Sequence, residues 1–593
     1  LAAASVEGEL FTAQVLAEVM KVPERSLLRQ LSGDLERRHG LVREQEEIFT
    51  GQRRLSRYQF SHILFQDYLY QRLSVGERRL LHGEVASALE ALHEGQLDEM
   101  AVQLAHHYYQ SGDYQQAFYY NTRAGERAAR LFESREAIIH YTRAIKLADD
   151  VHTDIDSLVK LHRGRGLACE TIGEFEQARA DYEVILQIAR ATGERQIEWR
   201  ALIDLGKLWR SRDYDQTRGC FETALELAQQ IGDPLLLADS LNWLGNWYAN
   251  DEKHLQAVEY HQKALNILED LGDRQDLAVT LDLLGISSLL GDDLYASLHY
   301  YDRAILLNRE LNDHSGLVSS LIGRATIVSV LVNLGVIPVI PPPDAVLDFE
   351  EALRIAGEID SASDQAWAYW SLGMFNTVHG HFESALENGQ NSLRIASNIG
   401  HREYAVGARS VLGRIYIELF AVEKAWEQLE EGLALAEDLH SPIWRHLIIG
   451  SFAGLHLLMN EPEQAQACLE QVTLSGMDPG AKRYCWLRRA ELALATDDPA
   501  LALDITDRLI ASTPSMAPWR VITYLWKLKA DALVAMKPTE TARVETAHSL
   551  LLAAIDNAQA SGERFLMWRL QASLGRLYRI LGDRVGAERA FSA

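Results

Sequence analysis

The stretch Leu241-Asn-Trp-Leu-Gly-Asn-Trp-Tyr248 is the clearest unit of a repeat, because its central glycine recurs along the chain at a nearly constant interval. The glycines follow one another at spacings of 39, 40 and 38 residues, and then again at 40 and 41: Gly206, Gly245, Gly285 and Gly323, then Gly373, Gly413 and Gly454. An alanine lies twelve residues after several of these glycines, at Ala257, Ala385 and Ala425, and Ala587 lies twelve residues after Gly575, which belongs to the last unit. Self-similarity at such a period predicts a repeat array.

Each repeat predicts a pair of antiparallel helices. Glycine in the first helix lets the second approach closely, and the alanine is the matching small residue. A short polar turn such as Asn250-Asp-Glu-Lys253 separates them, and apolar residues recur at helical spacing on both sides. Gly232, Gly272 and Gly400 close their units, and Asn312 stands where a fourth Gly would. This pattern suits a helix that ends in a left-handed residue.

These residues resemble the tetratricopeptide repeat (TPR) family, and the 40-residue period resembles its long-helix subclass. The resemblance covers residues 99–593 and implies an all-α TPR superhelix, an α-solenoid of about ten to twelve helix pairs. Another kind of α-solenoid is the alternative, and it would hardly alter the functional argument. Residues 459–546 keep the helices but little of the consensus. Arrays of this kind bind partners, so we expect no enzymatic activity.

One interval is about ten residues too long, from Gly323 to Gly373. The excess contains Val336-Ile-Pro-Val-Ile-Pro-Pro-Pro-Asp344, and three consecutive prolines cannot sit inside a helix. We expect a proline-rich insertion near 336–344, in the form of a rigid extended loop at the tip of one unit. Its apolar residues would either pack on the array or touch a neighbouring domain.

The first 98 residues lack the repeat. Segments 11–20, 22–39, 61–73 and 76–93 are predicted as helices, and 41–47 and 55–60 as strands around a polar turn at Gly51. Helix, helix, hairpin and helix are typical of a winged-helix domain, which we place at 1–75. A connecting helix at 76–98 follows it, and the TPR array at 99–593 completes the chain.

The N-terminal region resembles the segment after the nucleotide-binding core in bacterial signal-transduction ATPases with numerous domains. The group includes regulators like the maltose-regulon activator and ATPase-linked adenylate cyclases. The likeness rests on three stretches: Leu1–Phe11, Tyr58–Tyr70, and Ala105–Ala117. It implies a cytoplasmic sensor arm whose upstream core would carry ATP or ADP, with His62 near the nucleotide phosphates. The alternative is a His at a helix start with a local partner only. The chain looks excised from something longer.

Composition narrows the possible partners. The chain has 84 acidic and 58 basic residues, a net charge of −26, which disfavours nucleic acid and anionic membrane. DNA binding through the winged helix therefore remains the lesser alternative. Four cysteines without zinc-ligand spacing suit thiols in a reducing compartment. The sequence shows no phosphate loop, GxSxG, HExxH or GxGxxG motif, so we expect no catalytic residue, metal or cofactor in this chain.

In a TPR pair the first helix lines the concave face, so residues near the repeated glycines are candidates for partner binding. These candidates are Lys207, Arg210, Asn242, Asn246, Asn250, Asp282, Arg324 and Arg414. The three asparagines form an i, i+4, i+8 stripe that would clamp a peptide backbone, since Asn is a poor helix former. The basic residues indicate an acidic or carboxylate-bearing ligand, unless they neutralise neighbouring acidic helices. Trp367 and Trp370 are interpreted as core.

Three functions follow from these patterns. The first is a sensor arm that binds a protein, peptide or small-molecule inducer on its concave face and relays this to an upstream ATPase core. The second is a free-standing TPR scaffold that joins protein partners. The third is a transcription factor that binds DNA through the winged helix.

Overall fold

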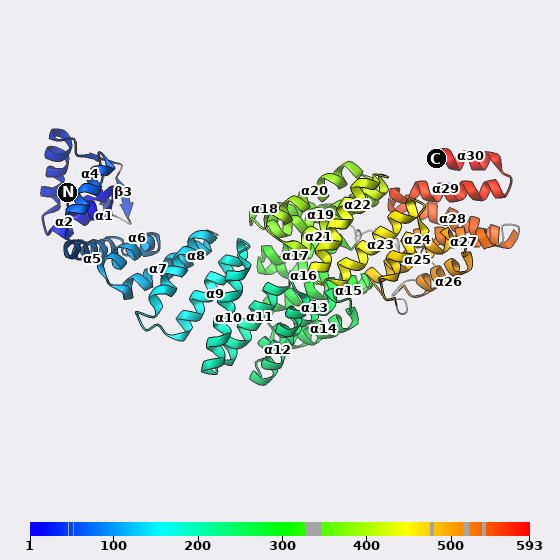
Figure 1. Ribbon diagram of the computed structural model, residues 1–593, viewed down its shortest axis with the longest axis horizontal. Coiled ribbons are helices and arrows are strands. Elements are labelled where there is room, and N and C mark those ends of the chain that lie inside the picture. The colour runs from blue at the N-terminus through cyan, green and yellow to red at the C-terminus, as the bar shows by residue number, and fades with distance from the viewer. Residues whose placement is uncertain are drawn as a thin grey trace. The chain divides into compact units, whose positions relative to one another are not determined.

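The computed structural model describes residues 1–45, 47–50, 53–131, 133–210, 212–327, 345–474, 479–513, 521–536 and 541–593 (Figure 1). They form two compact units, unit 1 (Leu1–Ala201) and unit 2 (Leu202–Ala593), and each is described by itself below. The proline-rich insertion predicted near 336–344 lies outside the described residues.

Unit 1 begins with short helices and two small antiparallel sheets. In the larger sheet the strand order is β1-β5-β2, and a separate hairpin pairs β3 with β4. The elements are α1 (Ala4–Glu7), β1 (Leu10–Thr12), α2 (Ala13–Met20), α3 (Glu24–Arg29), the π-helical η1 (Gln30–Arg38), β2 (Val42–Glu44), β3 (Ile48–Thr50), β4 (Arg53–Leu55), β5 (Arg57–Phe60), α4 (Ile63–Arg72) and α5 (Val75–Leu92).

The predicted strands within 41–47 and 55–60 are present, but the predicted helix 11–20 starts later than expected. Leu10 to Thr12 pair with β5, Phe11 lying opposite Tyr58, and the helix begins only at Ala13. Tertiary pairing overrides the helical pattern here because Phe11 is fully buried in this sheet.

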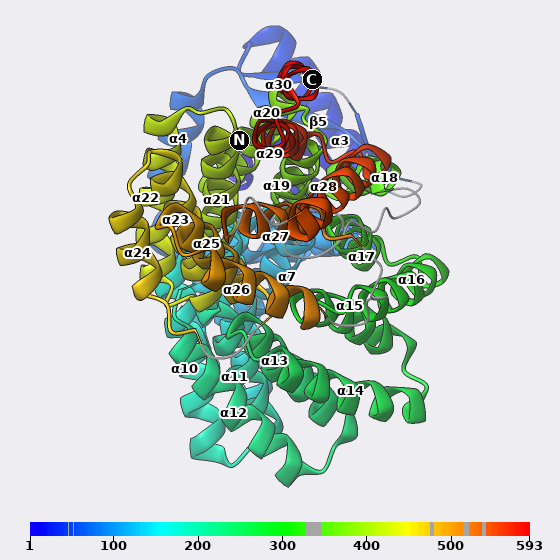
Figure 2. The same cartoon turned by 90° about the vertical axis from the view of Figure 1, so that its right-hand side faces the viewer.

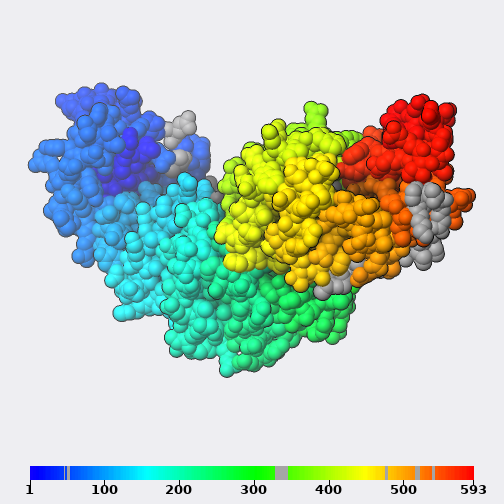
Figure 3. Space-filling view, turned by 45° about the vertical axis from the view of Figure 1, so that its right-hand side comes forward, coloured from blue at the N-terminus to red at the C-terminus, as the bar shows by residue number. Residues whose placement is uncertain are grey.

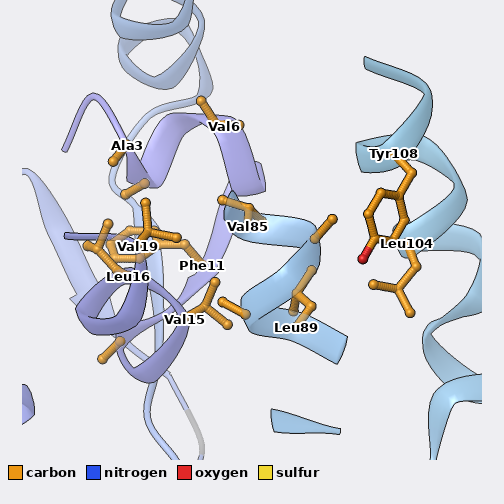
Figure 4. Close-up of a cluster of buried hydrophobic side chains, with 14 of the residues drawn as sticks. Ala3, Val6, Phe11, Val15, Leu16, Val19, Val85, Leu89, Leu104 and Tyr108 are labelled. Carbon is orange, nitrogen blue, oxygen red and sulfur yellow. The ribbon is translucent and has the colours of Figure 1, made fainter. Parts of the chain in front are cut away.

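The core of this region joins the first sheet strand and α2 to α5. Val15 points toward Leu89 of α5, and Phe11, Leu16 and Val85 belong to the same hydrophobic cluster (Figure 4). All five side chains are almost completely buried, so α5 is part of this hydrophobic core as well as a connection to the repeats.

The chain from residue 97 onward is a succession of antiparallel helices, which confirms the predicted all-α TPR-type array. Unit 1 continues with α6 (Leu97–Ser111), α7 (Tyr114–Arg130), α8 (Ser134–Ala148), α9 (Ile155–Thr171) and α10 (Phe175–Thr192). The helices that follow are α11 (Arg195–Trp209), α12 (Tyr214–Ile231), α13 (Pro234–Asn250), α14 (His254–Leu271), α15 (Arg274–Leu290), α16 (Leu294–Leu311), α17 (His314–Thr326), α18 (Ala345–Glu358), α19 (Ala362–Val378), α20 (Phe382–Asn398), α21 (Arg402–Glu418), α22 (Val422–Asp438), α23 (Pro442–Leu458), α24 (Pro462–Glu470), α25 (Ala481–Ala495), α26 (Pro499–Ala511), α27 (Thr523–Met536), α28 (Thr541–Ser561), α29 (Arg564–Ile580) and α30 (Arg584–Ser592). From α11 on, each odd-numbered helix is the first member of a pair and each even-numbered helix the second.

Two of the repeated glycines, Gly245 and Gly285, make room for a ring on the second helix. A Cβ on Gly285 would lie 2.7 Å from Cζ of Tyr301, and a Cβ on Gly245 would lie 2.7 Å from Cε1 of His261. Both rings are fully buried. Close approach was predicted from the sequence, and the structure adds that an aromatic ring, sixteen residues after each of these glycines, fills the space.

The predicted helix ends are confirmed. Gly232, Gly272 and Asn312 follow α12, α14 and α16 with φ angles of 78°, 71° and 55°. Asn312 therefore takes the left-handed conformation that its place in the glycine series predicts.

Unit 2 coils until helices far apart in sequence pack against each other. One hydrophobic cluster joins Leu289 of α15 and Tyr301 of α16 to Tyr484 and Leu487 of α25 and Leu525 of α27. Figure 1 and Figure 2 both place α25 and α26 beside α15, and in Figure 3 the yellow and orange surface of unit 2 meets its green surface. Successive turns of the superhelix therefore close on one another.

Ion pairs also join these turns. Glu252 lies in the turn after α13, and its buried carboxylate accepts a hydrogen bond from Nδ1 of His446, 194 residues later, at 2.7 Å. Nζ of Lys482 lies 3.8 Å from the same carboxylate. Farther along, Arg569 of α29 donates to Glu418 of α21, and both side chains are 16% exposed. The turn at 250–253 was predicted as merely polar, but its glutamate is a buried link between superhelical turns.

Two further findings concern the whole described chain. No described helix is long and apolar enough to cross a membrane. The four cysteines are free thiols: Cys169 and Cys485 are buried, and Cys220 and Cys468 are partly exposed.

Candidate functional site

Unit 2 encloses a cavity of about 320 Å³ that we call the lumen cavity. Its walls are α13, α15, α17, α19, α21 and α23, together with Arg210 just after α11. All are first helices of their pairs. Five of the eight predicted partner-binding residues line it: Arg210, Asn246, Asn250, Asp282 and Arg414.

Unit 1 carries a larger hollow of about 740 Å³ along α5, but it is the weaker candidate. That groove is more open, and none of the residues predicted from the sequence lines it. Both hollows fall in the size range of about 300–1,000 Å³ that small-molecule sites have. The lumen cavity is preferred because it is more enclosed and combines apolar walls with a few polar groups.

One face of α21 runs along the lumen cavity. Glu403, Tyr404, Ser410, Val411 and Arg414 line it at helical intervals. At 1.5 Å of rise per residue the stripe from Glu403 to Arg414 is about 16 Å long. The cavity is therefore elongated, with polar groups at both ends of this stripe.

The aromatic part of the wall comes from two helices. Trp367 and Trp370 of α19 and Trp444 of α23 line the cavity, and Trp370 meets Trp444 edge to face with ring centroids 6.0 Å apart. The interpretation of Trp367 and Trp370 as core is thus incomplete, because both also face the cavity. Trp444 was missed because Pro442-Ile-Trp444 lies at the start of its helix, away from the repeated glycine.

The acidic part of the wall is Asp282 of α15. Its carboxylate accepts hydrogen bonds from Oγ of Ser319 at 2.8 Å and from Oγ of Ser320 at 2.7 Å. Burial raises the pKa of Asp282 to about 6, although the two serine hydroxyls act in the opposite direction. The carboxyl group thus titrates close to neutral pH.

The basic part of the wall lies at both ends of the α21 stripe. Arg210 is at the end that holds Glu403, whose carboxylate accepts a hydrogen bond from the hydroxyl of Tyr214 at 3.4 Å. Arg414 is at the other end, where its guanidinium lies 5.4 Å from the ring centroid of Tyr484. Burial lowers the pKa of Arg414 from its usual value.

Asn242 is placed differently from its two partners in the predicted stripe. Its side chain is buried, its Nδ2 donates to Oγ1 of Thr280 at 2.7 Å, and its Oδ1 lies 3.3 Å from Nδ1 of His261. The asparagine therefore joins α13, α14 and α15 and does not line the cavity. Asn246 and Asn250 do line it.

Two of the predicted basic residues are engaged within the array. Arg324 forms a two-bond fork with the carboxylate of Asp348, at 2.9 and 2.7 Å, and a third bond of 2.7 Å with Asp302. It therefore neutralises neighbouring acidic helices, which is the alternative that the sequence left open. Nζ of Lys207 lies 4.3 Å from the ring centroid of Trp243, and Lys207 does not line the lumen cavity.

His62 caps a helix in unit 1. It is exposed at the N-cap of α4, and its Nδ1 accepts a hydrogen bond from the backbone N–H of Leu64 at 3.2 Å. This is the local partner that the alternative interpretation expects. Among the described residues, no group of three or more His, Cys, Asp or Glu side chains is placed to hold a metal ion.

Comparison with known proteins supports the repeat and goes little further. Residues 206–270 match the tetratricopeptide repeat family model. No curated protein matches the sequence.

Solved structures with a similar array share little sequence with this chain. They include the apo form of RapI (15% identity, covering 48% of this chain and 99% of that one, TM-score 0.41). A Rap protein in complex with competence and sporulation factor is 15% identical, and the match covers 72% of this chain and 100% of that one with a TM-score of 0.39. Yeast Tom70 is 16% identical, and the match covers 86% of this chain and 100% of that one with a TM-score of 0.34. At these values the likeness establishes neither a shared function nor a shared ligand. Residues 206–270, from which the lumen cavity takes Arg210, Asn246 and Asn250, are thus similar to tetratricopeptide repeats.

Proposed function

We propose that unit 2 is a binding module that encloses its ligand in the lumen cavity. The observation that carries this proposal is that Arg210, Asn246, Asn250, Asp282 and Arg414, chosen from the repeat frame alone, line one cavity. Repeat arrays commonly bind on the concave surface that their stacked units create. In unit 2 that surface is closed into a lumen.

The size of the cavity limits what can bind there. A volume of about 320 Å³ admits a small molecule or a short stretch of extended peptide, and it excludes a folded domain. A protein scaffold, the alternative from the sequence, would use the outer surface of the array. The two functions therefore differ in where a substitution blocks binding.

The test fills the lumen without disturbing the outside. Asn246→Trp places an indole in the cavity, whereas the matched control Asn266→Trp changes an exposed asparagine on α14. The full chain is incubated with a pool of tetrapeptides and with pooled metabolites, and the compounds retained after gel filtration are identified by mass spectrometry. We expect compounds retained by the wild type and by Asn266→Trp but not by Asn246→Trp. Retention of none, or equal retention by all three proteins, would overturn the proposal.

We further propose that the chain is the sensor arm of a signalling ATPase, with unit 1 as the link between the array and a nucleotide-binding core. The resemblance from Leu1 to Ala117 motivates this. The order of β1, α2, α3, β2 and β5, with two helices before an antiparallel strand pair, supports a winged helix there. The exposed ring of His62 is compatible with a contact to another domain.

The coding sequence around this chain tests the sensor-arm proposal. We expect the codons directly before Leu1 to encode a GxxxxGK[ST] phosphate loop within an ATPase core. A start codon close to Leu1, with no such loop before it, would reject the sensor arm and favour the free-standing module.

A further inference from the structure

A second and much smaller cavity lies where α21 meets α25, α27 and α29, and we call it the closure cavity. Its volume is about 30 Å³. A single water molecule needs about 10–15 Å³ of such space, so the closure cavity has room for one or two atoms of that size. It is too small for an organic acid or a phosphate.

Three arginines from three helices line this cavity. They are Arg414 of α21, Arg488 of α25 and Arg569 of α29. An arginine side chain keeps its charge in proteins, so these side chains bring three positive charges to one small volume.

Two glutamates balance two of these charges. Glu418 accepts hydrogen bonds from both terminal nitrogens of Arg569, at 2.5 and 3.1 Å. Glu491 accepts one from Nη1 of Arg488 at 2.6 Å and another from the hydroxyl of Tyr524. The side chains of both ion pairs are only 14–16% exposed, so water screens their charges weakly.

Arg414 adds the third positive charge. Its guanidinium lies 5.4 Å from the ring centroid of Tyr484, and the guanidinium of Arg488 lies 4.7 Å from the same ring. Burial lowers the pKa of Arg414, and the charge of Arg488 acts in the same direction. Lys527 is close to this cluster as well, but Asp531 at 2.7 Å matches its charge. The described groups around the cavity therefore carry one more positive charge than negative charges.

The apolar part of the wall makes this excess charge unfavourable. It consists of Ile417, Leu487, Phe565 and Leu566. An unbalanced charge costs more beside apolar groups than in water, because the local dielectric constant is lower there. A small anion would balance the charge, and guanidinium N–H groups are strong donors to anions.

We propose that the closure cavity binds one monovalent anion of the size of chloride. The anion contacts Arg414 of α21 together with the arginines of α25 and α29, and so links helices from different turns of the superhelix. The chain as a whole has a net charge of −26, which opposes general anion binding, so the local arginines must hold the ion. Arg414 lines both cavities, but this inference does not depend on the proposed function of the lumen cavity.

Crystals of the full chain grown in sodium bromide test the site directly. Bromide replaces chloride in halide sites, and its anomalous scattering distinguishes it from water. We expect an anomalous peak in the closure cavity, in contact with Arg414. Density for water alone, with no anomalous signal, would overturn the inference.

Two variants change the charge of the site in opposite directions, and the width of the ³⁵Cl NMR signal measures chloride binding in solution. Arg414→Met removes the excess charge, so we expect it to abolish the line broadening that bromide displaces. Glu418→Gln keeps the side-chain shape but removes a negative charge. It should bind chloride about tenfold more tightly, since a nearby unit charge changes such equilibria by at least that factor.

Arg576→Met is the matched control, because Arg576 lies on α29 outside the cavity and its side chain is 59% exposed. We expect it to keep the wild-type broadening. Equal broadening in the wild type and Arg414→Met, weaker chloride binding by Glu418→Gln, or an equal loss in Arg576→Met would overturn the inference. The lumen-filling variant Asn246→Trp should retain the broadening, so failure of the binding module and failure of the anion site are distinguishable.

Discussion

Replacing Gly285 with alanine tests the packing on which the repeat depends. A Cβ at this position would lie 2.7–2.8 Å from three ring atoms of Tyr301, a fully buried side chain. The ring or α15 would have to move by about 1 Å to restore a carbon contact of about 3.5–4.0 Å. Such overpacking costs about 1–3 kcal/mol, against a gain of about 1 kcal/mol from replacing a helical glycine.

Gly219→Ala is the matched control. Gly219 lies inside α12, is exposed, and has no atom within 4 Å of the place that a Cβ would take. It keeps the helix gain without the clash, so we expect Gly219→Ala to stabilise the array. The free energies of unfolding of the two variants should differ by about 1–3 kcal/mol, because the helix term cancels between them.

The assay is urea denaturation followed by circular dichroism, with hydrogen exchange and mass spectrometry to localise the effect. Long arrays need not unfold in one step, so the exchange rates of peptides from α15 and α16 decide the outcome. We expect these peptides to exchange faster than in the wild type in Gly285→Ala and at the wild-type rate in Gly219→Ala. Equal stabilisation by both substitutions would refute the view that this glycine is needed for the ring.

Three further predictions concern polar residues of unit 2. Asp282→Asn should stabilise the fold by about 3 kcal/mol at pH 7 and by less than about 1 kcal/mol at pH 4. The reason is that the Asp282 carboxyl has a pKa of about 6 in the folded state and 3.8 in the unfolded chain, so it destabilises the fold increasingly as the pH rises between these values. Denaturation midpoints at both pH values measure the difference, and a gain independent of pH would contradict the prediction. Asn242→Ala should cost about 1–3 kcal/mol, since it leaves the buried Nδ1 of His261 without its partner and removes the bond to Thr280. Asn246→Ala should change stability by less than about 0.5 kcal/mol, and equal thermal midpoints of the two variants would oppose this. Arg569→Ala should cost about 3 kcal/mol, because it leaves the largely buried Glu418 without its partner. The double variant Glu418→Ala, Arg569→Ala should lose less unfolding free energy than the two single variants lose in sum. Strict additivity of these losses would argue against a coupled pair.

The repeat could be predicted from the sequence because its signals are local. Gly245 and Ala257 lie within one helix pair, and Asn312 marks a helix end by its own backbone preference. Each of these features needs only a few turns of chain to act. The odd-numbered helices were therefore placed correctly as the first members of their pairs.

The lining of the cavity could be predicted only in part because its position shifts along the array. Arg210 lies four residues after Gly206, Asp282 lies three residues before Gly285, and Trp444 lies ten residues before its glycine. The lining thus moves from the C-terminal end of α11 to the N-terminal end of α23. A frame fixed to the repeated glycine therefore finds Arg210 and Arg414 but misses Trp444, and it includes Lys207 and Asn242, which do not line the cavity.

The closure of the superhelix left no pattern in the sequence. Glu252 and His446 are 194 residues apart, and each stands in an ordinary polar position of its own repeat. Their contact depends on the summed rotation of several units, which small differences at each helix pair determine. The same holds for the two indoles, since Trp370 and Trp444 meet only after α19, α21 and α23 are stacked.

The most direct measurement is a crystal structure of the full chain with the compound that it retains most strongly. If the lumen cavity is the binding site, density for the compound lies inside unit 2, between α13, α15, α19 and α21, in contact with Asn246 and Trp370. Density on the outer face formed by the even-numbered helices, with the lumen cavity holding no part of the compound, would contradict that placement.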